Sequence, residues 1–329
     1  MAPQSTVAKL LARGRQLLWS YAAKAQEFVC GKKNGVPKKK NGGLKRIGRG
    51  SFATVFSCGG YAVKRIANVK VGRKEAEIAL EIKRNGGHPH IVELERVIER
   101  PKEVVIVMQL AAGDALSLVP PSTEGRNQRP YIEMVFRMMT QVAKALVWMH
   151  RHGMSHNDLK PDNVLVTTRG STPTPCPAPT SSTPWSTPTA KARTLTAASS
   201  TTQEPVPYDF LLSDISPPNV MSPVYAAPEQ IRDNTGSEPA DIFALGAMVE
   251  EMLTGKRPSW VGEDDMEPKE RGAFLYGRGI GSLKRRPPVL PASCPELLRD
   301  IIESCMQDNP GDRPTAADVV RMLEAAVVQ

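Results

Sequence analysis

The nine residues from Ser155 to Asn163 read Ser-His-Asn-Asp-Leu-Lys-Pro-Asp-Asn, and the apolar run 164–166 follows at once. An aspartate, a lysine two residues later and an amide five residues later therefore lie just before a short expected strand. Asp158 can accept a proton from a hydroxyl, and Lys160 can neutralise a phosphoryl group in transfer. Asn163 can hold a metal ion through its carbonyl oxygen. The alternative is a polar loop whose Asp and Asn only close turns.

This stretch resembles the catalytic loop of protein kinases, H-R-D-x-x-x-x-N. The resemblance makes Asp158 the catalytic base, Lys160 the group that stabilises the transferred phosphoryl and Asn163 a magnesium ligand. His156 is in place, whereas Asn157 stands where the family usually has arginine. A lysine two residues after the aspartate is similar to the serine/threonine branch of the family rather than the tyrosine branch.

Length and composition are those of a globular protein. A chain of 329 residues, 40% apolar and 23% charged, can bury a full core as one large domain or two lobes. No run of eighteen apolar residues occurs, so we expect no membrane-spanning segment. The five cysteines lie far apart without C-x-x-C pairs, which indicates reduced thiols rather than disulfides or a zinc site.

The net charge of +9 is concentrated at one end of the chain. Residues 1–50 hold twelve Lys and Arg against the single acid Glu27, a net of +11, so the other 279 residues sum to −2. A nucleic-acid-binding body would carry its basic face on the fold itself. We therefore expect no sequence-specific nucleic-acid partner.

Residues 1–43 are expected to form a basic N-terminal extension. Within 1–29, leucines recur among Lys and Arg as in an amphipathic helix. A membrane-surface helix, a mitochondrial transit peptide and a helix docked on the next domain stay open, as does a frayed tail. The lysines between Lys32 and Lys40 favour nuclear entry slightly over a solvated linker. We expect an intracellular protein, cytoplasmic or nuclear.

Residues 47–55, Ile-Gly-Arg-Gly-Ser-Phe-Ala-Thr-Val, predict a strand, a glycine turn and a second strand. Glycines let backbone N–H groups approach phosphate oxygens, although a plain hairpin turn would look similar. The stretch resembles the kinase Gly-rich loop, with Gly48, Gly50 and Val55 in place and Ala53 at the third glycine position.

Lys64 ends an alternating strand that starts at Tyr61 and resembles the V-A-I-K strand of the family. On that resemblance Lys64 binds the α- and β-phosphates. We expect a helix from Gly72 to Asn85, and in kinases one glutamate of this helix pairs with the lysine. Glu77 lies nearest the usual distance before the next strand, whereas Glu75 suits the apolar spacing of the helix better. We choose Glu77.

The stretch from Val104 to Asp114 predicts a buried strand that runs into a turn. It resembles the last strand of the small kinase lobe and the hinge, whose backbone groups bind adenine. On that resemblance Met108 limits the depth of the adenine pocket, and the hinge runs from Gln109 to Ala111. The stretch 131–152 is apolar at every third or fourth position, which predicts a long helix facing the core.

Residues 170–207 break these patterns. Sixteen of the 38 residues are Ser or Thr and eight are Pro. Such a segment cannot bury enough apolar surface to offset the entropy of ordering, so we expect a disordered insert where a tight hairpin would otherwise lie. Four Thr-Pro pairs are candidate sites for proline-directed phosphorylation, but we favour a passive insertion.

A strand resumes at Phe210 and leads to Asp214, which resembles the Asp of the family's Asp-Phe-Gly, the main magnesium ligand. Ile215 keeps an apolar plug in this motif, whereas Ser216 lacks the conformational freedom of glycine. The arginine that Asn157 replaces binds an activation-loop phosphate in the family. We therefore expect activity without phosphorylation of this loop.

Residues 222–229, Ser-Pro-Val-Tyr-Ala-Ala-Pro-Glu, resemble the family's G-T-P-x-Y-x-A-P-E segment, with Ser222 at the threonine position. Asp241 opens an apolar helix that runs to Thr254, and on the resemblance its carboxylate braces the backbone of the catalytic loop. Arg313 matches the arginine that pairs with the glutamate of Ala-Pro-Glu. We predict an ion pair between Glu229 and Arg313.

Together these motifs make residues 44–325, apart from the insert, similar to a eukaryotic-type protein kinase, and their departures are typical of a divergent member, for example a viral one. The resemblance implies an α+β, bilobal fold with a β-rich N-lobe at 44–111 and a mainly helical C-lobe at 112–329. It implies a monomeric kinase that uses ATP and Mg²⁺ to phosphorylate Ser and Thr of protein substrates. The nucleotide-site residues it implies are Ile47, Gly48, Gly50, Val55, Lys64, Glu77, Met108, Gln109 and Ala111.

Two other functions stay open. A pseudokinase or scaffold is favoured by the departures at Ala53, Asn157 and 215–216, but none of these removes a group that would touch phosphate or metal. A small-molecule phosphotransferase shares a loop with Asp and Asn. The segments around Glu229 and Asp241, which build a peptide-binding platform in the family, argue against it.

Overall fold

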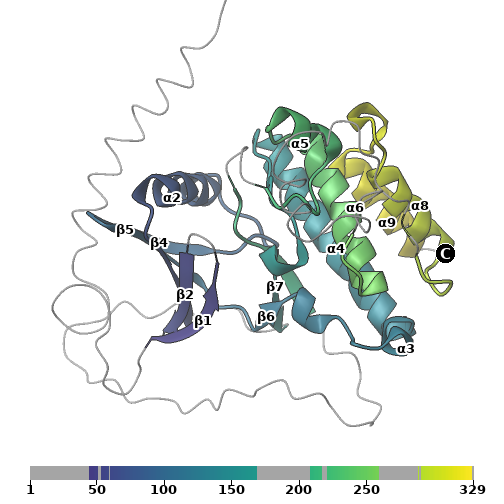
Figure 1. Cartoon of the computed structure of the whole chain (residues 1–329), viewed down its shortest axis with the longest axis horizontal. Helices are drawn as coiled ribbons and strands as arrows, with labels where there is room; N and C mark the ends of the chain where they lie inside the picture. Colours follow the sequence, from purple (N-terminus) through teal and green to yellow (C-terminus); the bar gives the residue numbers. More distant parts are fainter. Residues whose placement is uncertain are drawn as a thin grey trace, which may run out of the picture.

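The computed structural model describes residues 44–50, 53–58, 60–168, 208–216, 221–258, 288 and 290–327. The expected basic extension at 1–43 and the expected insert at 170–207 lie outside these ranges. A strand-rich part faces a larger helical part (Figure 1), so the expected bilobal fold with a β-rich N-lobe and a helical C-lobe is confirmed. Among the described residues, no helix combines the length and apolar character needed to cross a membrane.

The N-lobe is built on an antiparallel five-stranded sheet of order β1-β2-β3-β5-β4. Its strands are β1 (Lys45–Arg49), β2 (Ala53–Cys58), β3 (Tyr61–Ile66), β4 (Leu94–Arg100) and β5 (Glu103–Gln109). In β3 every second residue is buried, and these are Ala62, Lys64 and Ile66. Because side chains alternate across a strand, Lys64 shares a buried face with two apolar neighbours.

Helix α2 (Val69–Arg84) packs against this sheet. It begins three residues earlier than expected, because the side chain of Asn68 accepts hydrogen bonds from two N–H groups of the first turn. Gly72 lies directly against β5: a Cβ at this position would be 2.7 Å from the Cβ of Val104. The absence of a side chain at Gly72 therefore sets how closely α2 approaches the sheet.

The connection from α2 to β4 joins the lobes. At the end of α2, the Nζ of Lys83 donates to the C=O of Leu94, at 2.7 Å. The chain then forms two backbone bonds with β8 of the C-lobe, from the N–H of Val92 to the C=O of Leu212 and from the N–H of Leu212 to the C=O of His90, each 2.9 Å. The C-terminal end of α2 is thus bonded to β4 of the N-lobe and, through the residues that follow it, to β8 of the C-lobe.

Low pH is expected to reduce the free energy of unfolding through a histidine in this connection. Burial and the neighbouring His90 lower the pKa of His88 to about 4, and the Nδ1 of His88 accepts a hydrogen bond from the N–H of His90 at 3.2 Å. An unfolded histidine titrates near pH 6.5, so between about pH 6.5 and about pH 4 the unfolded state binds the proton first. The free energy of unfolding therefore falls as the pH is lowered through this range.

Urea midpoints at pH 7 and pH 5 measure this loss. The His88→Gln variant should lose less stability between the two pH values than the wild type, and the exposed His152→Gln control should follow the wild type. Equal losses in all three proteins would show that His88 does not contribute.

The C-lobe begins with a small antiparallel sheet of order β6-β7-β8. Its strands are β6 (Gly113–Asp114), β7 (Val164–Thr168) and β8 (Tyr208–Leu212). Thr168 and Tyr208 are paired across β7 and β8 although forty residues separate them in sequence. The two strands on either side of the Ser/Thr/Pro-rich stretch are therefore neighbours, as the sequence predicts.

The remaining helices form the body of the C-lobe. They are α3 (Thr123–Arg126), α4 (Arg129–Arg151), α5 (Pro228–Asp233), α6 (Glu238–Thr254), α8 (Glu296–Cys305) and α9 (Ala316–Val327), with the short 3₁₀ turns η2 (Leu116–Leu118), η3 (Pro161–Asn163) and η6 (Pro310–Asp312). The long helix expected at 131–152 is confirmed as α4. Helix α6 is buried almost all round, with α4 and α8 against it.

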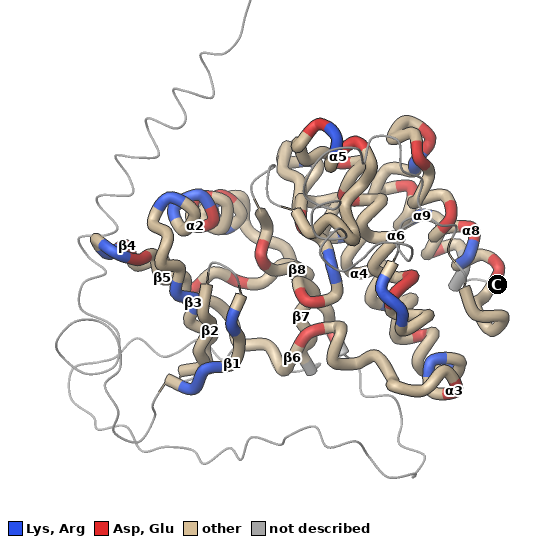
Figure 2. The backbone as a smooth tube through the Cα atoms, viewed as in Figure 1, with Lys and Arg blue, Asp and Glu red and all other residues tan. Residues whose placement is uncertain are grey.

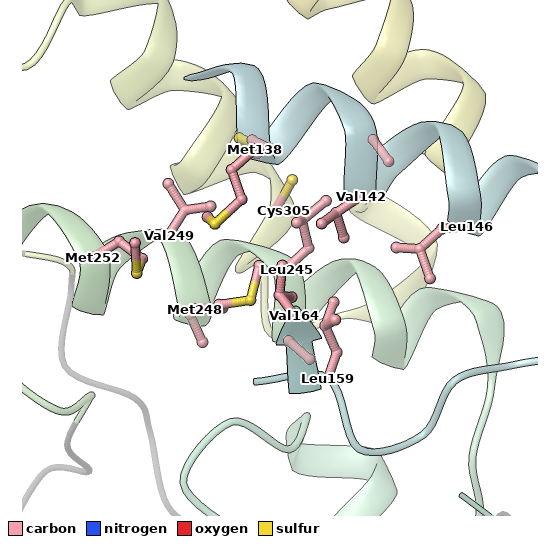
Figure 3. Packing of buried hydrophobic residues seen from close by; sticks show 14 of the residues in the cluster. Met138, Val142, Leu146, Leu159, Val164, Leu245, Met248, Val249, Met252 and Cys305 are labelled. Carbon is pink, nitrogen blue, oxygen red and sulfur yellow. The ribbon is translucent and has the colours of Figure 1, made fainter. Parts of the chain in front are cut away.

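Apolar packing between α4 and α6 forms the centre of the C-lobe core. Figure 3 shows methionine, valine and leucine side chains of both helices meeting beside Leu159 and Val164 of the catalytic loop and β7. The hydroxyl of Tyr131 on α4 also donates to the C=O of Met252 on α6, at 2.8 Å. The polar loop at 155–163 therefore rests directly on a close-packed base.

Lys and Arg are concentrated on α2 and the N-terminal sheet, whereas the C-lobe helices carry both signs (Figure 2). Residues 44–111 contain thirteen Lys and Arg and seven Asp and Glu. Part of this charge is paired: Arg65 and Arg100 each lie 2.7 Å from Glu103, and Arg73 lies 3.1 Å from Glu99. The Arg73–Glu99 pair is exposed, and exposed pairs contribute little to stability.

Candidate active site

Lys64 is a buried cation between the lobes, in contact with two carboxylates that are partly exposed. Its Nζ is 2.6 Å from the Oε1 of Glu75 on α2 and 2.6 Å from the Oδ1 of Asp214 after β8. Burial alone would lower the pKa of Lys64, but the two carboxylates outweigh it and hold the pKa above its ordinary value. The lysine is therefore a cation fixed between α2 and the segment that follows β8.

The choice of Glu77 as the partner of Lys64 is wrong. Glu75 makes the contact, and the side chain of Glu77 is exposed. The reason is the apolar face of α2, on which Gly72, Ala76 and Ile82 are buried. Glu75 is one turn from Gly72 on that face, whereas Glu77 lies on the opposite side of the helix.

The neighbouring glutamates provide a matched pair of variants. We expect Glu75→Gln to lower kcat/KM for ATP roughly 10- to 100-fold, because it removes the charge that positions Lys64. Glu77→Gln should stay within about twofold of the wild type. Steady-state kinetics with varied ATP measure both, and equal effects of the two changes would contradict the assignment.

The catalytic loop places Asp158 between two donors. Its Oδ2 accepts hydrogen bonds from the Nζ of Lys160 at 2.9 Å and the Nδ2 of Asn163 at 3.1 Å. Turn η3 brings Asn163 back to this point, and its Nδ2 also donates to the C=O of Asp158 at 2.7 Å. The other oxygen of Asp158, Oδ1, is buried and has no partner within the described residues. Buried acceptors usually have a hydrogen-bond partner, so this oxygen is open to a donor that the described residues do not supply.

Asp241 braces the backbone of this loop, as expected. Its Oδ2 accepts from the N–H of His156 and its Oδ1 from the N–H of Asn157, both at 2.8 Å. The Nε2 of His150 lies 3.0 Å from the same carboxylate, which is only 1% exposed. Two backbone groups just before Asp158 are thereby fixed by one side chain at the start of α6.

The segment after β8 is joined to the catalytic loop through Ser213. Both the N–H and the hydroxyl of Ser213 donate to the C=O of Asn163, at 2.9 and 3.1 Å. The Nε2–H of His156 donates to the C=O of Ser213 at 3.0 Å. Asp214 follows in the left-handed region with φ +57°, which glycine, asparagine and aspartate adopt more readily than other residues. Its carboxylate lies 2.6 Å from the Nζ of Lys64.

Asn163 and Asp214 are suited to a magnesium ion. Within the described residues, no group of three or more His, Cys, Asp or Glu could hold a metal by itself. Mg²⁺ is usually bound by one or two protein oxygens together with substrate phosphates. The Nδ2 of Asn163 and the Oδ1 of Asp214 are engaged within the protein, which leaves the amide oxygen of Asn163 and the Oδ2 of Asp214 for such an ion. The chemistry of this pair fits magnesium with a phosphate ligand.

Residues 221–229 lie against the catalytic loop. The Nζ of Lys160 donates to the Oγ of Ser222 at 2.8 Å, and the hydroxyl of Tyr225 donates to Glu251 on α6 at 2.5 Å. The predicted ion pair is confirmed: Arg313 binds both carboxylate oxygens of Glu229, at 2.6 and 2.9 Å. Lys160 thus links the loop of Asp158 to the segment expected to support a peptide.

The residues expected around adenine lie on β1, β2 and β5 and in the connection that follows β5. Gly48 and Val55 are paired across β1 and β2, above the strand of Lys64, and Ile47 is 50% exposed. Met108 is buried at the end of β5, and residues 109–111 connect β5 to β6 and so join the lobes. Behind Met108 a cavity extends between α2 and the catalytic segments, and its lining includes Glu75, Met108 and Asp214.

Several residues of this network were not singled out from the sequence. Ser213, Gln230 and Gly236 all contact the catalytic loop or its neighbours, and the Nε2 of Gln230 donates to the C=O of Asn157 at 2.9 Å. No sequence pattern marks them, because each matters only through a partner fifty or more residues away. The signal for Glu75, its place on the apolar face of the helix, was present in the sequence.

Comparison with known proteins agrees with this geometry. A family model described as the protein kinase domain matches residues 43–174 and 208–323. The mitogen-activated protein kinase kinase kinase ANP1 of Arabidopsis thaliana is 28% identical over 291 residues, which are 84% of this chain and 38% of that protein. Calcium-dependent protein kinase 8 of the same plant is 27% identical over 298 residues, 84% of this chain and 47% of that protein.

A third relative is mitogen-activated protein kinase kinase kinase 13-B of Xenopus laevis, 27% identical over 293 residues, which are 88% of this chain and 26% of that protein. The chain spans less than half the length of each of these relatives. The crystal structure of Rad53 residues 1–466 in complex with AMP-PNP is similar in fold, with a TM-score of 0.55 and 23% identity over 86% of this chain and 65% of that one. The chain belongs to the protein kinase family.

Proposed function

We propose that the chain is a serine/threonine protein kinase that transfers the γ-phosphate of ATP to hydroxyl groups of protein substrates. The observation that carries this proposal is the free Oδ1 of Asp158, buried beside Lys160 and Asn163. An acceptor in this position suits a substrate hydroxyl, whose proton it would orient and take up. The names of the relatives, all protein kinases, support the same activity.

In the proposed reaction the protein positions charge and does little covalent chemistry. The glycine turn that contains Gly48 and Gly50 lets the backbone approach the phosphates, which the ammonium of Lys64 binds while Glu75 keeps Lys64 in place. The half-exposed Ile47 and the neighbouring Val55 offer apolar surface to the base. Met108 closes the pocket, and the backbone from Gln109 to Ala111 binds the edge of adenine. The AMP-PNP of the Rad53 complex supports a nucleotide in this cleft.

Asn163 and Asp214 are proposed to hold Mg²⁺. When bound, the ion would neutralise charge on the phosphates. Lys160 adds a second positive charge near the hydroxyl. It donates to both Asp158 and Ser222, so it is aligned before a substrate arrives. Such preorganisation lowers the barrier because little needs to move during transfer.

The substrate is proposed to be a peptide segment of another protein. Residues 221–229 are held between Lys160 on one side and Arg313 on the other, which leaves a rigid surface beside Asp158. A small-molecule phosphotransferase would not need this platform. We further propose nucleotide binding mainly by residues 44–111, substrate binding by 112–329, and an intracellular monomer, as the sequence indicates.

The test is transfer of labelled γ-phosphate to a basic carrier protein such as histone in the presence of Mg²⁺. The wild type should label serine and threonine of the carrier, and Lys64→Met should not. Nucleotide binding without transfer by the wild type would show a pseudokinase, and label on tyrosine alone would place the chain in the other branch.

Phosphatase treatment tests regulation. Asn157 cannot bind an activation-loop phosphate as arginine does, so the purified kinase should keep its activity within about twofold after dephosphorylation. Loss of most of the activity, restored by rephosphorylation, would contradict this prediction.

A further inference from the structure

Asn157, the residue before Asp158, is buried at the meeting point of three segments. It is 7% exposed and adopts φ +69°, a left-handed conformation that asparagine tolerates better than most residues. Its N–H donates to Asp241 and its C=O accepts from Gln230. The backbone of Asn157 is therefore fixed by side chains of α5 and α6.

The side-chain amide of Asn157 holds the segment that carries Asp214. Its Nδ2 donates to the C=O of Ser216 at 2.7 Å and to the C=O of Ser155 at 3.1 Å. In return, the N–H of Ser216 donates to the C=O of His156 at 3.0 Å. Both amide hydrogens are used, and Ser216 is attached to the catalytic loop through its N–H and its C=O.

Gly236, between α5 and α6, makes room for this amide. A Cβ on Gly236 would be 1.6 Å from the Oδ1 of Asn157 and 2.4 Å from its Cγ. The φ of Gly236 is not left-handed, so glycine is needed here for space and not for its backbone conformation. Any side chain at position 236 must push the amide of Asn157 away from its present place.

We propose that Asn157 is a positioning residue: its amide, seated against Gly236, fixes Ser216 and thereby keeps the carboxylate of Asp214 directed at the nucleotide and metal site. The inference rests on the proposed kinase function for its catalytic consequence. It assigns a role to the asparagine at the one catalytic-loop position that departs from the kinase pattern, and it explains why Ser216, which lacks the freedom of glycine, is compatible with an ordered segment. Residues 157, 216 and 236 act as one unit.

Hydrogen exchange on the protein without metal or nucleotide tests whether the amide of Asn157 holds Ser216 in place. Asn157→Asp keeps the size and the left-handed preference but removes both donors, so exchange at the Ser216 amide should rise about tenfold or more. Asn157→Gly, which also permits φ +69°, and Gly236→Ala should act in the same direction. The controls are Asn234→Asp, exposed with φ +50°, and Gly311→Ala, where a Cβ meets no atom closer than 3.7 Å. Neither control should change exchange at Ser216.

The magnesium dependence of phosphotransfer tests whether Asn157 keeps the carboxylate of Asp214 directed at the metal site. In the Asn157 and Gly236 variants, the Mg²⁺ concentration for half-maximal activity should rise about tenfold, with partial recovery at high Mg²⁺. The proposal would be overturned if the folded variants exchanged the Ser216 amide at the wild-type rate. It would also be overturned if exchange rose but the Mg²⁺ dependence of activity did not change. If the wild type itself transfers no phosphate, the kinase function fails, and the exchange result still decides whether Asn157 holds Ser216.

Discussion

Asparagine in place of Asp158 is expected to lower kcat about 1,000-fold, within the range measured for removal of a general base. The Oδ1 of Asp158 is the buried acceptor proposed to take the hydroxyl proton, and an amide oxygen is a far weaker base. Lys160 and Asn163 already bind the other oxygen, so the fold can accept an uncharged side chain of the same size. Affinity for ATP should remain within about threefold.

Single-turnover transfer to a peptide measures the effect on chemistry, and fluorescence titration with ATP measures binding. The control is Asp233→Asn, an exposed carboxylate at the end of α5, which should leave kcat unchanged. A kcat within about tenfold of the wild type for Asp158→Asn would mean that another group accepts the proton.

Replacement of Arg313 by alanine is expected to cost about 3–5 kcal/mol of unfolding free energy. The guanidinium has no exposed surface and donates to Glu229 and to the C=O groups of Gln307, Asp308 and Pro239. It also stacks over the ring of Phe243 at 4.9 Å. The variant would leave a carboxylate that is 14% exposed and three carbonyls without their partner.

Urea denaturation measures the loss, with Arg313→Lys as an intermediate case because lysine keeps the charge but cannot bind both oxygens of Glu229. Arg129→Ala removes an ion pair whose side chains are 90% and 58% exposed, and it should change stability by less than about 1 kcal/mol. If Arg313→Ala were no more destabilising than Arg129→Ala, the pair would not support the C-lobe.

The sequence predicted the site best where the chemistry requires one residue type at one place. Lys64, Asp158, Asn163 and Asp214 lie in separate motifs, and the structure links them through the Lys64–Asp214 contact and the bonds between Asn163 and Ser213. Long periodic segments were predicted equally well, because α4 buries one continuous apolar stripe.

Prediction from the sequence failed where the packed face of a helix or contacts between distant segments determine what a side chain touches. Glu75 and Glu77 are both plausible from spacing, and only the side of α2 that meets the sheet distinguishes them. That side is the apolar face on which Gly72, Ala76 and Ile82 are buried. Asn157 could be recognised as a departure, but its partners at Ser216 and Gly236 follow only from the packing of α5 and α6.

The attachment of α2 at both ends affects how the cleft can open. Gly72 is pressed against Val104 near one end, and Lys83 is bonded to the start of β4 at the other, about 16 Å away along the helix axis. A helix fastened at two such points cannot swing outward about either of them. Sheet and helix should therefore travel together as one rigid block, and the bending between the lobes should be concentrated in the two segments that join them, after α2 and after β5.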